Sequence, residues 1–204
     1  VCRKLGINVW EVIDAAATKP FGFMPFYPGP GVGGHCIPID PYYLTYKARS
    51  VDYHTRLIEL AGEINDFMPE YVTSRLQDLL NEQEKPLKNS KILLLGVAYK
   101  GDVDDVRESP ALKVWSQLEA KGAEVIYHDP YCQFVRRKGQ IYHSHPLDKE
   151  LVKGVDAVVI TTAHTRGVDY KMVVAAASIV LDTKNIVTKI LRVDPASYPG
   201  LHLL

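Results

Sequence analysis

The sequence predicts an α/β protein in two parts, a helical segment followed by a Rossmann-like, doubly wound parallel sheet. Two observations lead to this class. Residues 54–84 carry apolar side chains at helical spacing, and from Lys91 onward short apolar runs alternate with helical patterns. Such alternation is typical of parallel sheets whose faces are covered by helices. We therefore expect a helical domain over residues 1–85 and a sheet domain over residues 90–204, separated by the polar segment NEQEKPLKNS.

The N-terminal stretch combines a helix pattern with a long loop. Val9, Val12, Ile13 and Ala16 have helical spacing, but no capping segment precedes them, so we expect that residues belonging upstream are missing. Residues 19–36 then contain four prolines and five glycines, which excludes a regular helix or strand. Glycines in such a loop let backbone N–H groups approach a ligand closely.

Two further helices complete the first part. Residues 41–49 form a short helix in which Pro41 is tolerated in the first turn. In the longer helix, an apolar stripe runs from Leu57 to Leu80 and belongs either to the core or to a partner interface. Pro69 interrupts this stripe and is expected to kink or restart the helix, because proline lacks an N–H and collides with the preceding turn.

The second part alternates strands with helices. Ligands of such sheets bind at the carboxyl ends of the strands. The first strand is not followed by the G-x-G-x-x-G fingerprint, so NAD is not the obvious ligand of this domain. The expected strands are 91–99, 123–130, 156–164 and 178–185; the expected helices are 109–122 and 170–178, and residues 146–155 form a helix or a loop.

Composition excludes several classes of partner. The 24 lysines and arginines balance the 24 aspartates and glutamates, so no basic field favours nucleic acid or an anionic membrane. No apolar run approaches the roughly 20 residues of a membrane span. The three cysteines are far apart in the sequence and do not suggest a disulfide framework or a zinc knuckle. We expect a cytoplasmic protein.

Cys36 is the sharpest candidate for chemistry. It ends the glycine-rich loop and precedes a helix, whose N-terminus favours a thiolate. Asp40 is near enough in sequence to share a site with it. Each also has a plainer interpretation, since a lone cysteine is often a small buried hydrophobe and aspartate before proline is a common turn former.

Three other groups are weaker candidates. Lys100 and Arg107 flank the start of the helix at Ser109, which suits a phosphate or carboxylate, although neighbouring aspartates could simply pair with both cations. His164 follows a strand end and either lines a ligand site or is a satisfied core histidine. His35 adjoins Cys36, but chain neighbours rarely point at one another, so a Cys–His dyad is not expected. A metal site made by the two histidines and Cys36 lacks a recognisable ligand spacing.

Two long motifs add a family resemblance. GPGVGGHCIPIDPYYL and GVAYKGDVDDVRESPALKV, separated by a long helical region, resemble the central and C-terminal domains of the UDP-glucose/GDP-mannose dehydrogenase family. The form GGHCIPIDP is similar to the branch that acts on UDP-N-acetylhexosamines, of which UDP-N-acetylglucosamine 6-dehydrogenases are the nearest type. The resemblance covers nearly the whole chain.

This resemblance implies an NAD-dependent oxidation of a sugar C6 hydroxyl to a carboxylate through a thiohemiacetal and a thioester. It implies Cys36 as the nucleophile and Asp40 as a group that positions or activates water. It also implies a homodimer formed through the central helices. Further residues would bind ligands: Tyr27, Gly29, Gly31, Gly33, Tyr99, Lys100 and Lys184 the UDP-sugar substrate, and Arg107 the NAD; no metal is implied.

The chain departs from the family pattern in three places. The N-terminal NAD-binding domain is absent, and so are the catalytic lysine and asparagine that the family places on the central helix upstream of CRKLGINVWEVI. The chain is therefore expected to be a fragment without turnover of its own. TKPFGFMPF stands where an arginine usually reaches a neighbouring subunit. Lys184 stands where an arginine is usual. A lysine there would bind a phosphate as a point charge, without the two parallel hydrogen bonds that an arginine can donate. The competing interpretation is a non-catalytic module for nucleotide-sugar binding and dimerisation.

Overall fold

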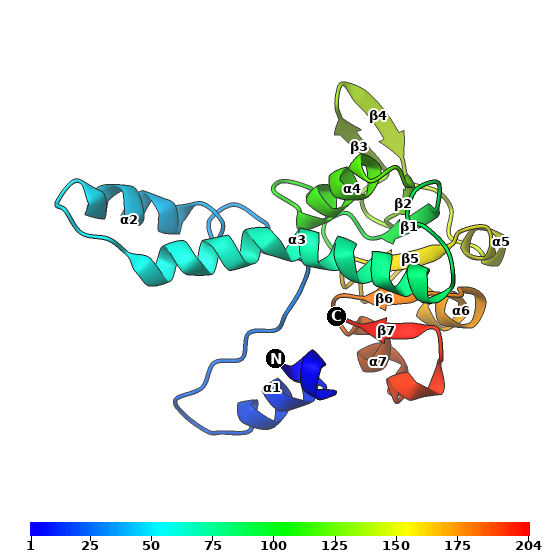
Figure 1. Ribbon diagram of the computed structural model, residues 1–204, viewed down its shortest axis with the longest axis horizontal. Coiled ribbons are helices and arrows are strands. Elements are labelled where there is room, and N and C mark those ends of the chain that lie inside the picture. The colour runs from blue at the N-terminus through cyan, green and yellow to red at the C-terminus, as the bar shows by residue number, and fades with distance from the viewer.

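The computed structural model describes residues 1–204 and confirms the predicted fold class, a parallel sheet preceded by helices (Figure 1). All five strands of the main sheet are parallel, in the order β2-β1-β5-β6-β7. The helices are α1 (Val9–Ala17), α2 (Asp40–Arg49), α3 (Arg56–Glu82), α4 (Pro110–Ala120), α5 (Lys149–Lys153), α6 (Tyr170–Ala176) and α7 (Ile186–Leu191). The strands are β1 (Lys91–Leu95), β2 (Glu124–His128), β3 (Phe134–Arg137), β4 (Gln140–His143), β5 (Ala157–Ile160), β6 (Val180–Asp182) and β7 (Leu201–Leu203).

The strand β1 shows why the sheet is covered on both faces. Its side chains alternate between two buried clusters: Ile92 and Leu94 pack with α3 and α4, whereas Leu93 and Leu95 pack with α5, α6 and α7. The chain passes from β1 to β2 on one side and later to β5 on the other, so the order of strands reverses at β1. In open α/β sheets, ligands bind beyond the strand ends at such a reversal.

The helix α4 follows its predicted signals closely. Ser109 caps it by accepting a hydrogen bond from the N–H of Ala111 at 3.3 Å, and Pro110 opens the first turn. The short segment predicted as helix or loop is the helix α5, capped by Asp148.

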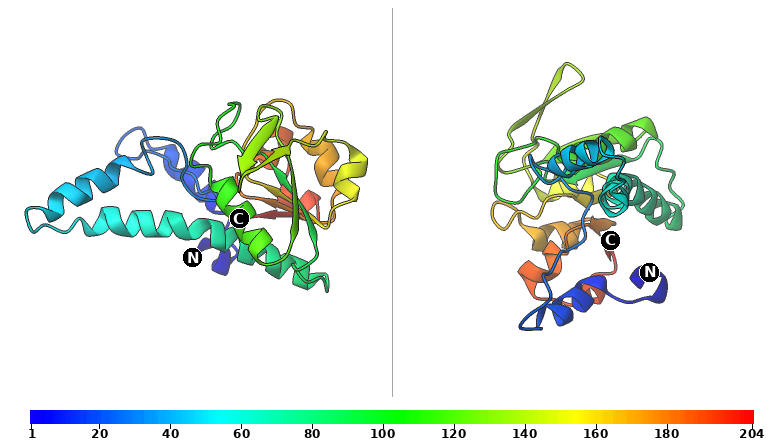
Figure 2. Two further views of the ribbon diagram at one scale, coloured as in Figure 1. Left: turned by 90° about the horizontal axis from the view of Figure 1, so that it is seen from above. Right: turned by 90° about the vertical axis from the view of Figure 1, so that its left-hand side faces the viewer.

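The long helix α3 divides into two functionally different halves. Leu76, Leu79 and Leu80 are buried in the core of the sheet domain. The first half projects from that domain as an arm together with α2, as Figure 1 and the left-hand view of Figure 2 show. The expected stripe from Leu57 to Leu80 is therefore partly core, and only its first half, including Leu57 and Leu60, remains exposed.

The helix α3 runs without interruption through Pro69, so the expected restart is wrong. Proline leaves the carbonyl of Asn65 without its helical N–H partner. The glycine-rich loop crosses α3 at this turn, because a Cβ added at Gly31 would lie 3.2 Å from that carbonyl oxygen. Packing of the second half of the helix against the sheet domain stabilises a continuous helix despite the proline.

The sequence patterns missed several short elements. These are the antiparallel hairpin β3–β4, the helix α7, the strand β7 and the two 3₁₀ helices η1 (Cys2–Leu5) and η2 (Pro195–Ser197). The hairpin carries charges on β3, and β7 has three residues, so neither has the apolar length that marks a strand in a sequence. No helix of the chain has the length and apolar character needed to cross a membrane.

Candidate functional site

The loops at the carboxyl edge of the sheet enclose a cavity of about 280 Å³ next to the strand-order reversal. Tyr99 and Lys100 come from the loop after β1, Ala163 from the loop after β5, and Lys184 from the turn after β6. Tyr27 and Pro28 of the glycine-rich loop close the cavity from the other side, together with Trp10 of α1 and Lys189 of α7. The structure therefore brings together four residues that the motifs pointed to, Tyr27, Tyr99, Lys100 and Lys184.

The glycine-rich loop is fitted to this edge at Gly29. A Cβ added there would lie 2.7 Å from Nζ of Lys184. Burial lowers the pKa of Lys184, and the negative charge of Asp182 acts in the opposite direction. Burial also raises the pKa of Asp182 to about 6, although the backbone N–H groups of Lys184 and Val187 donate to its carboxylate. The absence of a side chain at Gly29 thus leaves the Lys184 amine room at the cavity wall.

The next glycines pack on Tyr99 and α4. A Cβ at Gly33 would lie 2.7 Å from the carbonyl of Glu108 and 2.8 Å from Cδ of Pro110, and a Cβ at Gly34 would lie 3.0 Å from the Tyr99 ring. The loop therefore covers the start of α4, whose Ser109 and Pro110 are buried. The anion site expected at this helix N-terminus is not open.

Cys36 and Asp40 lie at the turn into α2, and both are exposed. The N–H of Asp40 donates to the carbonyl of Cys36 at 2.8 Å, so the two residues belong to one turn. Neither lines the cavity at the sheet edge. Tyr99 lies between the two places. Its side chain lines the sheet-edge cavity and also packs against Gly34, which is two residues before Cys36.

His35 ties this turn to the loop that precedes α4. Its Nε2 lies 3.2 Å from Oδ2 of Asp105, and Nη2 of Arg107 donates to the same oxygen at 2.7 Å. The hydrogen bond from Arg107 holds the pKa of the Asp105 carboxyl well below its ordinary value. His35 thus engages Asp105 and not its chain neighbour, and Arg107 is exposed at the end of this chain of contacts.

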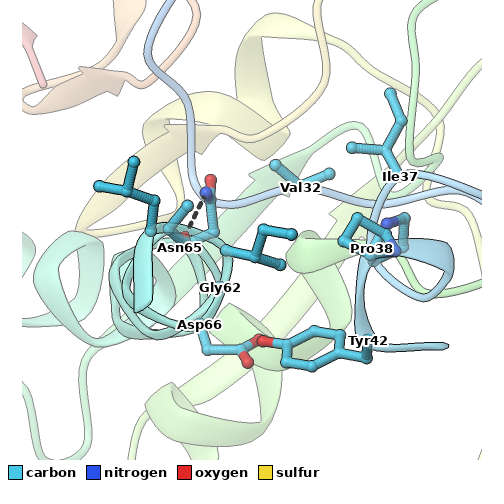
Figure 3. A pocket seen from close by; sticks show the side chains of 11 residues that line it. Val32, Ile37, Pro38, Tyr42, Gly62, Asn65 and Asp66 are labelled. Atoms are coloured by element: carbon cyan, nitrogen blue, oxygen red, sulfur yellow. Dashed lines mark hydrogen bonds between the residues drawn. The ribbon is translucent and has the colours of Figure 1, made fainter. Parts of the chain in front are cut away.

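A second, apolar cavity of about 340 Å³ lies between α2 and α3 (Figure 3). Tyr42 reaches from α2 to the surface of α3 at Gly62, where a Cβ would collide with its hydroxyl oxygen. Ile37 and Pro38, which follow Cys36, line the opposite wall. The rest of the lining comes from Val32 of the glycine-rich loop, Pro41 of α2, and Leu57 and other residues of α3. This cavity has no cationic residue in its lining, so charged ligands suit the sheet-edge cavity better.

His164 is a satisfied core histidine. It is fully buried, and its Nδ1 accepts from the N–H of Asp102 at 3.0 Å, so the ring proton resides on Nε2, which lies 3.1 Å from Asp129 Oδ2. Burial alone would raise the pKa of Asp129, but hydrogen bonds from His164 and from the N–H groups of Val97 and Cys132 bring that pKa to about 2. Both ring nitrogens of His164 are therefore occupied, which leaves none for a ligand.

Two cavity residues, Trp10 and Lys189, were missed by the sequence reasoning. Trp10 stacks on Tyr27 with ring centroids 5.7 Å apart, and Nζ of Lys189 lies 4.3 Å from the centroid of the Tyr27 ring. The hydroxyl of Tyr27 donates to Asp14 at 2.6 Å, which raises the pKa of Tyr27. The helical pattern of residues 9–16 includes Trp10 only as a neighbour of its apolar residues, which does not indicate a ligand site. No pattern near Lys189 in the sequence indicates one either. No group of three or more histidine, cysteine or acidic residues is arranged to hold a metal ion.

The chain is similar to known proteins over most of its length. Residues 1–67 match the central domain of the UDP-glucose/GDP-mannose dehydrogenase family, and residues 93–189 match the UDP binding domain of the same family. The UDP-N-acetyl-D-mannosamine dehydrogenase of Methanocaldococcus jannaschii is 39% identical over 196 residues, which are 93% of this chain and 42% of that protein. The UDP-N-acetyl-D-glucosamine 6-dehydrogenase of Pseudomonas aeruginosa is 32% identical over 165 residues, 81% of this chain and 38% of that protein.

A solved structure shares the fold. The UDP-D-ManNAc dehydrogenase of Pyrococcus horikoshii superimposes with a TM-score of 0.80 and 32% identity, over 98% of this chain and 44% of that one. The chain belongs to the UDP-glucose/GDP-mannose dehydrogenase family and carries parts of its central and UDP-binding domains. It spans less than half the length of these relatives.

Proposed function

We propose that this chain is the central and UDP-binding part of an NAD-dependent dehydrogenase that oxidises the C6 hydroxyl of a UDP-N-acetylhexosamine to a carboxylate. The observation that carries the proposal is the sheet-edge cavity, where Tyr27, Tyr99, Lys100 and Lys184 line one space beside the loop that leads to Cys36. The relatives named for UDP-N-acetylhexosamines support the substrate class. We also propose that residues 1–85 form the helical domain and residues 90–204 the UDP-binding domain. The proposed compartment is the reducing cytoplasm.

In this proposal, Cys36 is the nucleophile. Loss of a first hydride and of the hydroxyl proton converts the C6 alcohol to an aldehyde. The Cys36 thiolate adds to this aldehyde to form a thiohemiacetal, and loss of a second hydride from that carbon leaves a thioester. Water then attacks the thioester carbonyl, releases the carboxylate and returns the thiol. Asp40, in the same turn as Cys36, is suited to position that water or accept its proton. Exposure of the thiol leaves it open to a substrate approaching from the sheet edge.

The loop residues have a defined part in binding. Gly29, Gly31 and Gly33 bring the backbone of the loop close to Lys184, α3 and Tyr99 respectively, since each lacks the Cβ that would collide there. Lys100 and Lys184 supply positive charge to a UDP-sugar at the cavity wall. Tyr99 joins the cavity to the loop that carries Cys36.

NAD would accept the hydrides that leave the substrate carbon. The residues of this chain do not form a complete NAD site, because the loop after β1 lacks the dinucleotide fingerprint. Thr162 also fills the space beside Gly96, since a Cβ added at this glycine would lie 2.3 Å from the Thr162 side chain. We assign NAD to the longer protein. Arg107, exposed and oriented by Asp105, is the residue that this chain would contribute to NAD binding.

We further propose a homodimer formed through the exposed half of the long helix. Leu57, Leu60, Ile64 and Phe67 lie on one stripe of α3, and each is more than half exposed. An apolar stripe of this kind marks an interaction surface more often than a solvated one. Neither nucleic acid nor a membrane is proposed as a partner, since the chain has no net charge.

Calorimetry with a panel of nucleotide sugars tests the substrate class. UDP-N-acetylglucosamine, UDP-N-acetylmannosamine, UDP-glucose and GDP-mannose are titrated into the chain, and a preference for one UDP-N-acetylhexosamine is expected. A preference for GDP-mannose or UDP-glucose would contradict the proposed substrate.

The alternative function is a binding and dimerisation module without chemistry. The nearby pair Cys36 and Asp40 favours the enzyme, because a binding module has no need of a nucleophile. Cys36→Ser in the longer protein separates the two: loss of acid formation with retained nucleotide binding supports the enzyme, and unchanged oxidation excludes the thioester route.

A further inference from the structure

The loop after β1, residues 96–102, carries two of the proposed binding residues, Tyr99 and Lys100. It ends at Asp102, which has a positive φ of 61°. A backbone of this kind is unfavourable for a residue that has a side chain, so it persists only where the surrounding structure holds it. Other parts of the chain must therefore fix this loop.

Two buried side chains from the neighbouring strands do so. Asp129 follows β2 and His164 follows β5, and β1 lies between these two strands in the sheet. Oδ2 of Asp129 accepts hydrogen bonds from the N–H of Val97 at 2.7 Å and from that of Ala98 at 3.2 Å. Nδ1 of His164 accepts from the N–H of Asp102 at 3.0 Å. Together the two side chains hold the loop near its beginning and at its end.

His164 and Asp129 act as one unit. Because a backbone N–H can only donate, Nδ1 of His164 carries no proton, and the ring proton resides on Nε2, 3.1 Å from Oδ2 of Asp129. The carboxylate of Asp129 thus selects the tautomer that can accept from Asp102. Both side chains are fully buried, and a buried network whose members are all bonded is rigid.

Packing alone does not require this pair. Apolar side chains of similar size would fill the same space without the cost of burying a carboxylate and an imidazole. They could not, however, accept the three backbone N–H groups of the loop. Thr165, next to His164, adds a further hold on the loop, because its hydroxyl and its N–H donate to the carboxylate of Asp102 at 2.6 and 2.9 Å.

We propose that His164 and Asp129 are positioning residues, which fix the loop after β1 in the conformation that presents Tyr99 and Lys100 to a UDP-sugar. This inference rests on the proposed function, in which the sheet-edge cavity takes the substrate. It gives the buried pair a part in binding, although neither residue lines that cavity.

Two substitutions of His164 separate positioning from stability. The amide oxygen of asparagine occupies about the place of Nδ1, so His164→Asn keeps the acceptor for Asp102. The amide nitrogen of glutamine occupies about the place of Nε2, so His164→Gln keeps the bond to Asp129 and loses that acceptor. Each variant loses one of the two ring bonds, and urea unfolding is expected to show that both are destabilised.

Calorimetric binding of UDP to the 204-residue chain is the main measurement. His164→Gln is expected to weaken binding roughly tenfold, which is the effect of one hydrogen bond, whereas His164→Asn stays within about threefold of the unmodified chain. Amide hydrogen exchange without ligand should be faster at Asp102 in the Gln variant than in the Asn variant. His143→Asn and His143→Gln, at an exposed histidine of β4, are the matched controls and should change neither quantity.

Thr165 provides a test that does not disturb the core, because its side chain is exposed. Thr165→Val removes the hydroxyl that donates to Asp102 and keeps the shape, and it is expected to weaken UDP binding about threefold. Thr165→Ser keeps the hydroxyl and should restore the affinity. Should neither His164 variant fold, this pair carries the test alone, and equal affinities of its two members would overturn the inference.

The outcomes separate the positioning role from the function. If the unmodified chain binds UDP and the two His164 variants bind it equally, whether both tightly or both weakly, the positioning role is overturned and the proposed function stands. Equal exchange rates at Asp102 in the two variants would also overturn it. Failure of the proposed function has a different signature, since the unmodified chain would then bind no UDP, and the positioning role would fall with it.

Discussion

Nε2 of His35 lies 3.2 Å from Oδ2 of Asp105 and thereby joins the turn that carries Cys36 to the loop between β1 and α4. Arg107 holds the same carboxylate through two of its nitrogens. Because this interaction keeps the pKa of Asp105 well below its ordinary value, the carboxylate stays ionised throughout the working pH range of proteins. His35 and Asp105 therefore position the Cys36 turn without touching the thiol themselves.

Removing this link is expected to slow catalysis more than it weakens binding. In the longer enzyme, Asp105→Asn and His35→Ala should lower kcat roughly tenfold, because small misplacements of a nucleophile are costly, with KM for the nucleotide sugar nearly unchanged. Steady-state kinetics measures both. His35→Gln, which still donates to Asp105, should restore most of the rate, and Asp104→Asn, at the exposed neighbouring aspartate, is the control. Equal losses in kcat from the control would contradict a positioning role.

The close approach of Gly29 to Lys184 gives a test of the loop itself. Gly29→Ala would place a Cβ 2.7 Å from Nζ of Lys184 and displace the amine from the cavity wall. UDP affinity measured by calorimetry should fall roughly tenfold, with little change in Tm, since the amine is the end of a flexible side chain.

A second background makes the Gly29 test specific. In Lys184→Met, the amine is already gone, so adding Gly29→Ala should cost little further affinity. A full additional tenfold loss in the double variant would mean that Gly29 acts through something other than Lys184.

The proposed nucleophile makes the strongest kinetic prediction. In the longer enzyme, Cys36→Ser should reduce acid formation by at least about 10³-fold, because the hydroxyl is a far weaker nucleophile than a thiolate. Mass spectrometry of the product measures this. Cys2→Ser is the matched control, and it should leave the rate unchanged. A persistent rate in Cys36→Ser would exclude the covalent route.

The buried pair of Asp129 and His164 predicts a pH dependence of stability. The pKa of Asp129 is about 2 in the folded chain against an ordinary value of 3.8. A carboxyl group whose pKa is lowered by folding stabilises the fold at any pH above its ordinary pKa. Asp129 therefore contributes about 2.5 kcal/mol to the free energy of unfolding at pH 5, and this contribution is lost as the pH falls from about 4 to about 2. Urea unfolding at several pH values measures the loss.

Variants separate Asp129 from the other carboxylates. Asp129→Asn should remove this part of the acid dependence and destabilise the chain at pH 7, because an amide cannot accept all the N–H groups that meet here. Glu63→Gln, at an exposed glutamate of α3, should keep the full dependence. If both variants retain it, Asp129 is not its source.

The exposed half of α3 predicts the oligomeric state. Leu60→Asp should convert the proposed dimer to a monomer, since a charge in an apolar interface loses its hydration without a partner. Sedimentation velocity measures the mass. Phe134→Asp on the hairpin is a matched control, because Phe134 is 54% exposed and Leu60 is 51% exposed. A monomeric unmodified chain at high concentration would refute the interface.

Much of the fold was readable from local signals. The apolar run at β1, the Ser109–Pro110 start of α4 and the stripe of α3 each depend on neighbours in sequence, and the structure has all three. The two long motifs led to the correct family, and the resemblance that they carry named four residues that line the sheet-edge cavity, Tyr27, Tyr99, Lys100 and Lys184. The uninterrupted path of α3 through Pro69 was not readable, because it depends on the packing of its second half against the sheet domain.

The sequence by itself thus determined the longer elements, their order and the family. Only the tertiary structure decided that half of the α3 stripe is core, that His164 is bonded to Asp129, and that Trp10 and Lys189 meet at one cavity. The physical reason is the range of each effect. Periodicity and capping act over a few residues, whereas the partner of a buried face or of an unpaired donor is set by chain segments that only folding brings together.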